Sequence, residues 1–149
     1  MLTNLRTRAQ SDSGFTLVEL LVVMLILGLL ASIAIPAFFN QRTKAQDSAA
    51  KATAKAAQTA LETYATDNNG SYLSATRAGL KAIEPTLSSA TTGKNAITLL
   101  TVAADSYTLR VTSASGNTFS IVRSTDGSLT YPCTPTGGGG GCPGSAGWG

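Results

Sequence analysis

The chain has 149 residues, a formal net charge of +3, two cysteines and no histidine. This length gives room for one modest core, and the mild positive charge is no argument for nucleic-acid binding. The lack of histidine removes the commonest general base and metal ligand, and two cysteines cannot form a four-ligand zinc site. The sequence also has no GxxxxGK[ST] motif. We therefore expect a structural protein without a cofactor, not an enzyme.

Residues 15–39 form an apolar segment whose single charged side chain is Glu19. A helix of about 20 such residues crosses the ~30 Å hydrocarbon layer of a membrane, so this segment is predicted to span it. Arg6 and Arg8 precede the segment, which predicts a cytoplasmic N-terminus and an exported remainder. A conventional signal peptide, cleaved between Ala31 and Ala34, is the alternative. The apolar run is too long for that alternative.

The sequence GFTLVELL, which begins at Gly14, resembles the N-terminal motif of type IV prepilins and the related pseudopilins. The resemblance implies that a prepilin peptidase cuts after Gly14, removes a leader of residues 1–14, and methylates the new N-terminus at Phe15. It also implies that Glu19 pairs with the amine of Phe15 in a neighbouring subunit during assembly. A charge in an apolar medium needs an opposite charge, which favours this role. The alternative is that Glu19 simply reaches the lipid headgroups.

The helical pattern continues from residue 40 to residue 67 and stops at an Asn-Asn-Gly sequence. Pro36 and Gly28 are predicted to kink or loosen the preceding half of this helix. The second half is predicted to carry one polar and two apolar strips, of which one apolar strip covers the sheet of the same subunit and the other meets neighbouring helices. The polar strip contains Lys44, Asp47, Lys51, Lys55, Gln58 and Glu62; the apolar strips contain Ala50, Ala54, Ala57, Leu61 and Tyr64, and Ala45, Ala49, Ala52, Ala56 and Ala60.

The remaining residues predict a small head. A connecting segment at 68–96, with a short helix within 77–87, leads to a sheet at 97–132. Short β-rich runs at 96–104, 107–114, 118–124 and 128–132 are separated by turn sequences and predict an antiparallel meander. The fold class is therefore α+β, a long N-terminal helix packed on a small antiparallel sheet. Asp67, Asn68 and Asn69 could bind calcium, but a turn is the preferred interpretation.

Residues 133–149 are predicted to form a disulfide loop and a glycine-rich tail. Cys133 and Cys142 are the only cysteines of a chain expected to be exported, which predicts that they form one disulfide. Trp148 is either a contact residue or part of a disordered end.

The function expected from the resemblance is a structural subunit of a type IV pilus. Such a subunit is a single-pass membrane protein before assembly and part of an extracellular homopolymer afterwards. Its implied partners are the prepilin peptidase, the lipid bilayer, an inner-membrane assembly platform and, through that platform, its ATPase. A pseudopilin of a type II secretion or DNA-uptake system is the first alternative, and an exported binding protein with an uncleaved anchor is the second. Surface or DNA ligands are not identified by the sequence.

Overall fold

The computed structural model describes residues 14–87, 92–137, 141–144 and 147–149. It divides into two compact units, residues 1–37 and 38–149, which are described separately. Residues 1–13 of the predicted leader, including Arg6 and Arg8, lie outside the described residues.

The first unit consists of the apolar half of helix α1, which spans Leu17–Asp67. Almost every side chain of this unit is exposed, including those of its large aliphatic residues. Among the described residues, α1 is the one helix that is long and apolar enough to cross a membrane, judged by length and composition alone. The exposed apolar surface agrees with the predicted membrane-spanning segment.

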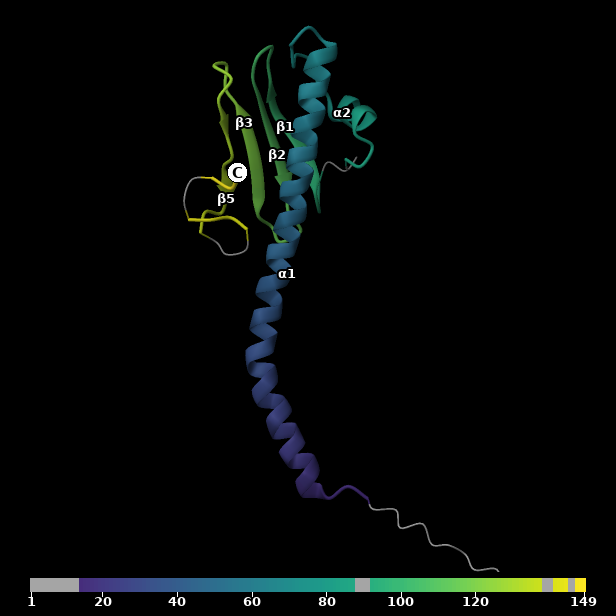
Figure 1. Ribbon diagram of the computed structural model, residues 1–149, viewed down its shortest axis with the longest axis vertical. Helices are drawn as coiled ribbons and strands as arrows, with labels where there is room; N and C mark the ends of the chain where they lie inside the picture. The colour runs from purple at the N-terminus through teal and green to yellow at the C-terminus, as the bar shows by residue number, and fades with distance from the viewer. Residues whose placement is uncertain (1–13, 88–91, 138–140, 145–146) are drawn as a thin grey trace, which may run out of the picture. The chain divides into compact units, whose positions relative to one another are not determined.

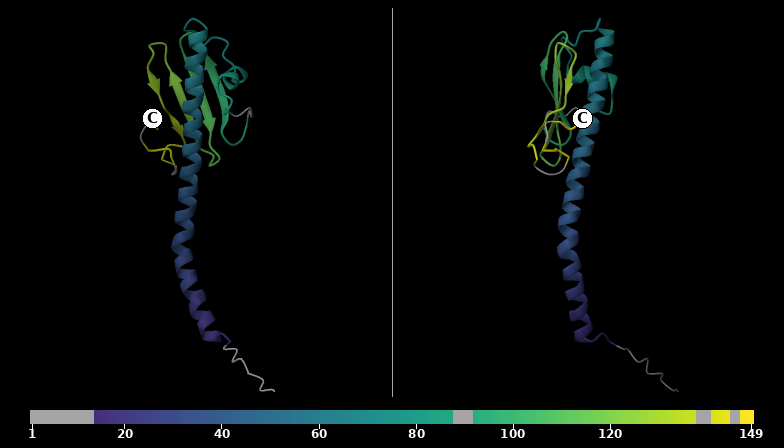
Figure 2. Two further views of the ribbon diagram at one scale, coloured as in Figure 1. Left: turned by 45° about the vertical axis from the view of Figure 1, so that its right-hand side comes forward. Right: turned by 60° about the vertical axis from the view of Figure 1, so that its left-hand side comes forward.

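In the second unit, the later half of α1 lies across one face of an antiparallel sheet, as Figures 1 and 2 show. The strands are β1 (Ala96–Val102), β2 (Tyr107–Thr112), β3 (Thr118–Arg123), β4 (Leu129–Thr130) and β5 (Cys133–Thr134). Their order is β1-β2-β3-β4, and β5 also pairs with β3. The predicted α+β fold, a long helix on a small antiparallel sheet, is confirmed.

The core forms where the buried strip of α1 meets the inner face of the sheet. Alternate residues of β2 point inward, because successive side chains of a strand face opposite sides. Cross-strand pairs extend the same face, since Leu109 lies opposite Ile121 and Val111 lies opposite Phe119. The helix contributes mostly alanine, whose small side chain lets the helix backbone approach the sheet closely. The fully buried apolar residues of this helix are Ala50, Ala54, Ala57, Ala60 and Leu61.

Helix α2 (Arg77–Ile83) lies beside β1 at one edge of the sheet (Figure 1). Thr76 begins it as an N-cap residue, because its hydroxyl accepts a hydrogen bond from the backbone N–H of Gly79 at 3.1 Å. The helix is shorter than the segment in which it was predicted and ends before Pro85.

Candidate functional site

The first turn of α1 holds the predicted assembly residue, Glu19. Thr16 precedes the helix, and its hydroxyl accepts a hydrogen bond from the Glu19 N–H at 3.1 Å. In return, the Glu19 carboxylate accepts hydrogen bonds from the N–H and the hydroxyl of Thr16, each at 3.0 Å. This reciprocal arrangement is a capping box, which satisfies backbone N–H groups that the first turn would otherwise leave unpaired. Glu19 therefore has a local structural role in addition to the predicted one.

The capping box was missed in the sequence analysis, although the sequence carries its signal. Thr16 and Glu19 stand three residues apart, directly before an apolar run, which is the T-x-x-E pattern of a helix start. Both groups are exposed. The carboxylate thus lies on the surface of the subunit, where a second charged group can reach it.

The other predicted residues of this segment lie close to the start of α1 or within it. Gly14 and Phe15 are exposed and precede the helix, so neither packs against another described element. Pro36 lies inside α1, and an added Cβ at Gly28 would meet no described atom within 4 Å. The kink at these two positions stays a prediction.

The side of α1 that faces away from the sheet has a surface of small, uncharged side chains. We call Ala45, Ala49, Ala52, Thr59 and Thr63 the alanine–threonine face; all five are exposed. The hydroxyls of Thr59 and Thr63 donate to the carbonyl groups four residues earlier, at 3.1 and 3.0 Å, and are thereby paired within the helix. Another helix can approach this surface closely without a bulky or charged side chain in the way. This agrees with the interpretation of the second apolar strip at Ala45, Ala49 and Ala52. It does not agree at Ala60, which is buried, or at Ala56, which is partly buried against the core.

Asp47 was predicted to lie on the solvent-exposed polar strip, and that prediction is wrong. Its side chain is 0% exposed. The carboxylate accepts hydrogen bonds from the Ser115 hydroxyl, from the Asn117 amide at 2.8 Å and from the Gly141 N–H at 2.7 Å. These donors belong to the β2–β3 turn and to the disulfide loop. Asp47 thus joins both loops to the helix.

The hydrogen bonds decide the charge state of Asp47. Burial alone raises the pKa of a carboxyl group. Hydrogen bonds to the Asp47 carboxylate outweigh this effect and hold its pKa below the ordinary value. The hydrogen bonds come from Ser115, Gly141, Ser113 and Asn117. The site also leaves no room for a side chain at Gly141, because an added Cβ would lie 2.8 Å from the Asp47 Cβ. The group is therefore a buried, charged carboxylate with several hydrogen-bond donors around it.

A second polar cluster lies further along α1, around Glu62. Its carboxylate accepts hydrogen bonds from the hydroxyls of Tyr72, at 2.6 Å, and Tyr107, at 3.1 Å, and lies 3.6 Å from a nitrogen of Arg123. Burial and the nearby carboxylate of Glu62 raise the pKa of Tyr72 to about 12, and the same causes raise the pKa of Tyr107. Both tyrosines stay protonated at neutral pH and hold the connecting segment and β2 to the helix.

The predicted disulfide between Cys133 and Cys142 is confirmed, and both residues are buried, at 5% and 3% exposure. Cys133 lies in β5, which pairs with β3, so the bond ties the loop to the sheet. The glycine-rich residues 138–140 inside the loop lie outside the described residues.

We expect the disulfide to resist reduction in the folded protein, because a reductant cannot reach buried sulfur atoms. Alkylation of the native chain should label no thiol, with or without mild reductant, whereas unfolding in the presence of reductant should expose both. Replacing both cysteines by alanine should lower the free energy of unfolding by about 2.5–3 kcal/mol. Labelling of the native, unreduced chain would show that the loop is open.

The possible calcium site at the end of α1 is a turn, as preferred in the sequence analysis. The Asn68 amide donates to the Tyr64 carbonyl at 2.8 Å, and the Gly70 N–H donates to the Ala65 carbonyl at 2.7 Å. Gly70 adopts a φ of 83°, which suits glycine at the end of a helix. Within the described ranges, no cluster of three or more His, Cys, Asp or Glu side chains could hold a metal ion.

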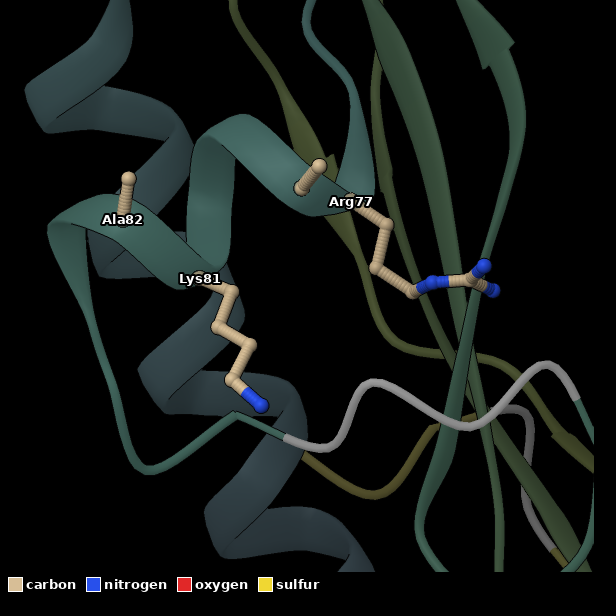
Figure 3. Close-up of a pocket in the computed structure, with 4 residues that line it drawn as sticks. Arg77, Lys81 and Ala82 are labelled. Carbon is tan, nitrogen blue, oxygen red and sulfur yellow. The ribbon is translucent and has the colours of Figure 1, made fainter.

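An open hollow of about 360 Å³ lies beside α2 and is lined by Arg77, Ala78, Lys81 and Ala82. Figure 3 shows that the side chain of Arg77 extends toward β1, whereas that of Lys81 points elsewhere. A nitrogen of Arg77 lies 3.4 Å from the Ile97 carbonyl, at the limit of a hydrogen bond. The two cations therefore do not converge on one point of the hollow.

Comparison with known families decides the nature of the N-terminal segment. Residues 10–35 match the family model described as the prokaryotic N-terminal methylation motif. The N-terminal segment is a prepilin methylation motif. The matched residues include Gly14, Phe15, Thr16 and Glu19, so the prepilin motif contains the capping box.

The relatives that this chain resembles carry two kinds of name. The type II secretion system core protein G of Pseudomonas aeruginosa is 40% identical over 74 residues, which are 50% of this chain and 51% of that protein. The protein of the same name from Klebsiella michiganensis is 38% identical over 76 residues, 51% of this chain and 52% of that protein. The type IV major pilin protein PilA of Myxococcus xanthus is 43% identical over 53 residues, 36% of this chain and 24% of that protein.

The chain spans about half the length of the core protein G relatives it matches. No solved structure shows a significant match. The similarity therefore establishes the prepilin motif, while the helix-on-sheet head is established by the structure itself.

Proposed function

We propose that this chain is a pseudopilin, a structural subunit that polymerises through its N-terminal helix in a type II secretion machine. The observation that carries the proposal is the prepilin motif at residues 10–35, joined to an α+β head, in a chain whose relatives include several type II secretion core proteins G. From the sequence alone, a pilus subunit was the expected function and a pseudopilin was the first alternative. The proposal reverses that preference.

The surface of the helix supports assembly with other copies of the same chain. Its first half exposes large aliphatic side chains, which need a membrane or other apolar helices around them. Its second half exposes the alanine–threonine face, which permits close helix–helix contact. A subunit held by a membrane before assembly and by neighbouring helices afterwards accounts for both surfaces.

In the proposed function, Glu19 sets the alignment of each new subunit with its neighbour in the filament. After cleavage at Gly14, Phe15 begins the chain and carries a positively charged amine. An incoming subunit then offers its Glu19 carboxylate to the amine of a subunit already in the filament, and the two charges neutralise each other in apolar surroundings. The exposed position of Glu19 makes its carboxylate accessible to such a partner.

Processing at Gly14 is directly testable. Replacing Gly14 by leucine should leave the full-length chain in the membrane, because the proposed peptidase requires the small residue before the cut. The wild-type chain should lose residues 1–14 and gain one methyl group at Phe15. Intact-mass measurement of membrane-extracted protein checks both outcomes. Cleavage near Ala34 would instead identify a conventional signal peptide and contradict the proposal.

A pilus subunit is the second candidate, supported by the similarity to the major pilin of Myxococcus xanthus. A deletion strain separates the two candidates. Loss of secreted proteins from the medium, with surface pili still visible by electron microscopy, is the result expected for a pseudopilin. Loss of pili with normal secretion would identify a pilus subunit. Restoring the wild-type gene must restore the lost property in either case.

A further inference from the structure

The buried carboxylate of Asp47 lies directly beside the disulfide. It accepts a hydrogen bond from the Gly141 N–H at 2.7 Å, and Gly141 is the residue before Cys142. Cys142 in turn is bonded to Cys133, which lies in β5. A hydrogen bond to the helix and a covalent bond to the sheet therefore hold two neighbouring residues of the chain. Whatever fixes Gly141 also restricts where the sulfur of Cys142 can lie.

Gly141 is seated closely against α1. A Cβ added at this residue would lie 2.8 Å from the Asp47 Cβ and 3.4 Å from the Lys51 Nζ. Asp47 and Lys51 are four residues apart, so both side chains belong to the same face of the helix. The backbone of Gly141 thus lies against two successive turns of α1, and a larger residue there would displace its neighbours.

Asp47 is a firm anchor for Gly141, because other groups hold its carboxylate from a second side. The Ser115 hydroxyl and the Asn117 amide, both in the β2–β3 turn, donate to the same carboxylate. Hydrogen bonds to a charged acceptor are roughly twice as strong as those between neutral groups. The side chain is also fully buried, so water does not readily replace a lost donor. The orientation of the carboxylate is therefore fixed independently of Gly141.

We propose that Asp47 is a positioning residue for the Cys133–Cys142 disulfide. In the reduced chain, its hydrogen bond to Gly141 keeps Cys142 close to Cys133 and so raises the effective concentration of one thiol at the other. The coupling is reciprocal: the hydrogen bond favours the disulfide by the same free energy by which the disulfide favours the hydrogen bond. The inference concerns the head alone and does not depend on the proposed function.

The step that Asp47 assists is a thiol–disulfide exchange with a small disulfide such as oxidised glutathione. One cysteine thiolate attacks a sulfur of glutathione disulfide, which forms a mixed disulfide and releases one glutathione thiolate. The second cysteine then attacks the first, and the second glutathione leaves. The two cysteines lose two protons and two electrons, and the two glutathione thiols that form take them up. Asp47 acts on the second attack, because that attack requires the two sulfurs of the chain to meet.

The equilibrium between reduced and oxidised chain measures this role. Full-length chain in detergent is incubated with fixed ratios of reduced and oxidised glutathione, starting from either form, until the oxidised fraction is constant. Acid quenching, alkylation of free thiols and mass spectrometry give that fraction. Asp47→Asn should lower the equilibrium constant for oxidation by about tenfold, because the amide is a weaker acceptor than the carboxylate for the Gly141 N–H.

Gly141→Ala tests the same contact from the other side and leaves the carboxylate unchanged. The added Cβ should push Gly141 away from Asp47 and lower the equilibrium constant by a similar factor. The double variant should be no lower than the lower of the two single variants, because both changes remove one contact. Effects that multiply in the double variant would show that the two residues act separately and would contradict the proposal.

Ser115→Ala and Asp67→Asn are the matched controls. Ser115→Ala removes a donor from the same carboxylate without changing the disulfide loop, and Asp67→Asn makes the same chemical change at an exposed site. Each should alter the equilibrium constant by less than about threefold. A tenfold loss with Ser115→Ala would show that Asp47 acts only through the general stability of the head. An unchanged constant with Asp47→Asn would show that it does not act on the disulfide, and either result overturns the proposal.

Discussion

Replacing Glu19 by glutamine should block polymerisation while membrane insertion and cleavage after Gly14 remain normal. Glutamine keeps the size of the side chain and can still serve in the capping box with Thr16, since that motif accepts Gln as well as Glu. It cannot neutralise the amine of a neighbour. An unpaired charge costs about 2.5–3.5 kcal/mol at the centre of a membrane helix and less near its end. The equilibrium constant for adding a subunit should therefore fall by up to roughly a hundredfold. Processed monomer should therefore accumulate in the membrane.

Thr16→Val is the matched control for this experiment. Valine has the shape of threonine but no hydroxyl, so the variant weakens the capping box and leaves the charge of Glu19 unchanged. The start of the helix should lose about 0.5–2 kcal/mol, and filaments should still form. Filaments counted by electron microscopy decide between the two roles. Normal filaments from Glu19→Gln with few from Thr16→Val would assign Glu19 to helix capping alone and would falsify the pairing role.

Replacing Asp47 by asparagine should lower the free energy of unfolding of the head by about 2–3 kcal/mol. Hydrogen bonds to a charged group contribute about 1.5–3 kcal/mol each, and the asparagine amide would also face donors with which it cannot bond. The single tryptophan, Trp148, packs against Phe119 and Tyr131 and reports unfolding by its fluorescence in a urea titration of the detergent-solubilised chain. Asp67→Asn, the same change at an exposed site, should shift stability by no more than about 0.5 kcal/mol.

The effect of Asp47 should also depend on pH. Because its pKa in the folded chain lies below the ordinary value of 3.8, its contribution is fully present above that value. The contribution is lost as the pH falls through the lower folded-state pKa, where protonation removes the charge. The stability of wild type and Asp47→Asn should therefore converge in strong acid. Equal urea midpoints at neutral pH would show that the buried carboxylate contributes nothing.

Features carried by local patterns were predictable from the sequence. The β-rich runs and the turn sequences between them predicted the antiparallel meander. The helical spacing predicted two apolar strips on the second half of α1, and the structure shows that the strip with Ala50, Ala54, Ala57 and Leu61 covers the sheet. The disulfide followed from two cysteines in a chain expected to be exported. Each of these predictions concerns residues whose polarity or chemistry is the usual one for the place where they lie.

The errors concern side chains whose surroundings come from distant segments. Asp47 was placed in solvent because a carboxylate is usually exposed, but its donors Ser115 and Gly141 lie 68 and 94 residues away in the sequence. Strand β5 has two residues, too few to show an alternating pattern. The place of Trp148 depends on contacts with Lys51 of α1 and with Phe119 of β3, which come together only after the helix and the sheet have packed.

The most direct measurement of the central claim is a helical reconstruction of the assembled filament by cryo-electron microscopy. We expect the first half of α1 to lie in a helical bundle, with the Glu19 carboxylate within about 4 Å of the Phe15 nitrogen of a neighbouring subunit, the distance of an ion pair. A filament in which Glu19 contacts only its own Thr16, and no amine of another subunit, would contradict assembly through this residue.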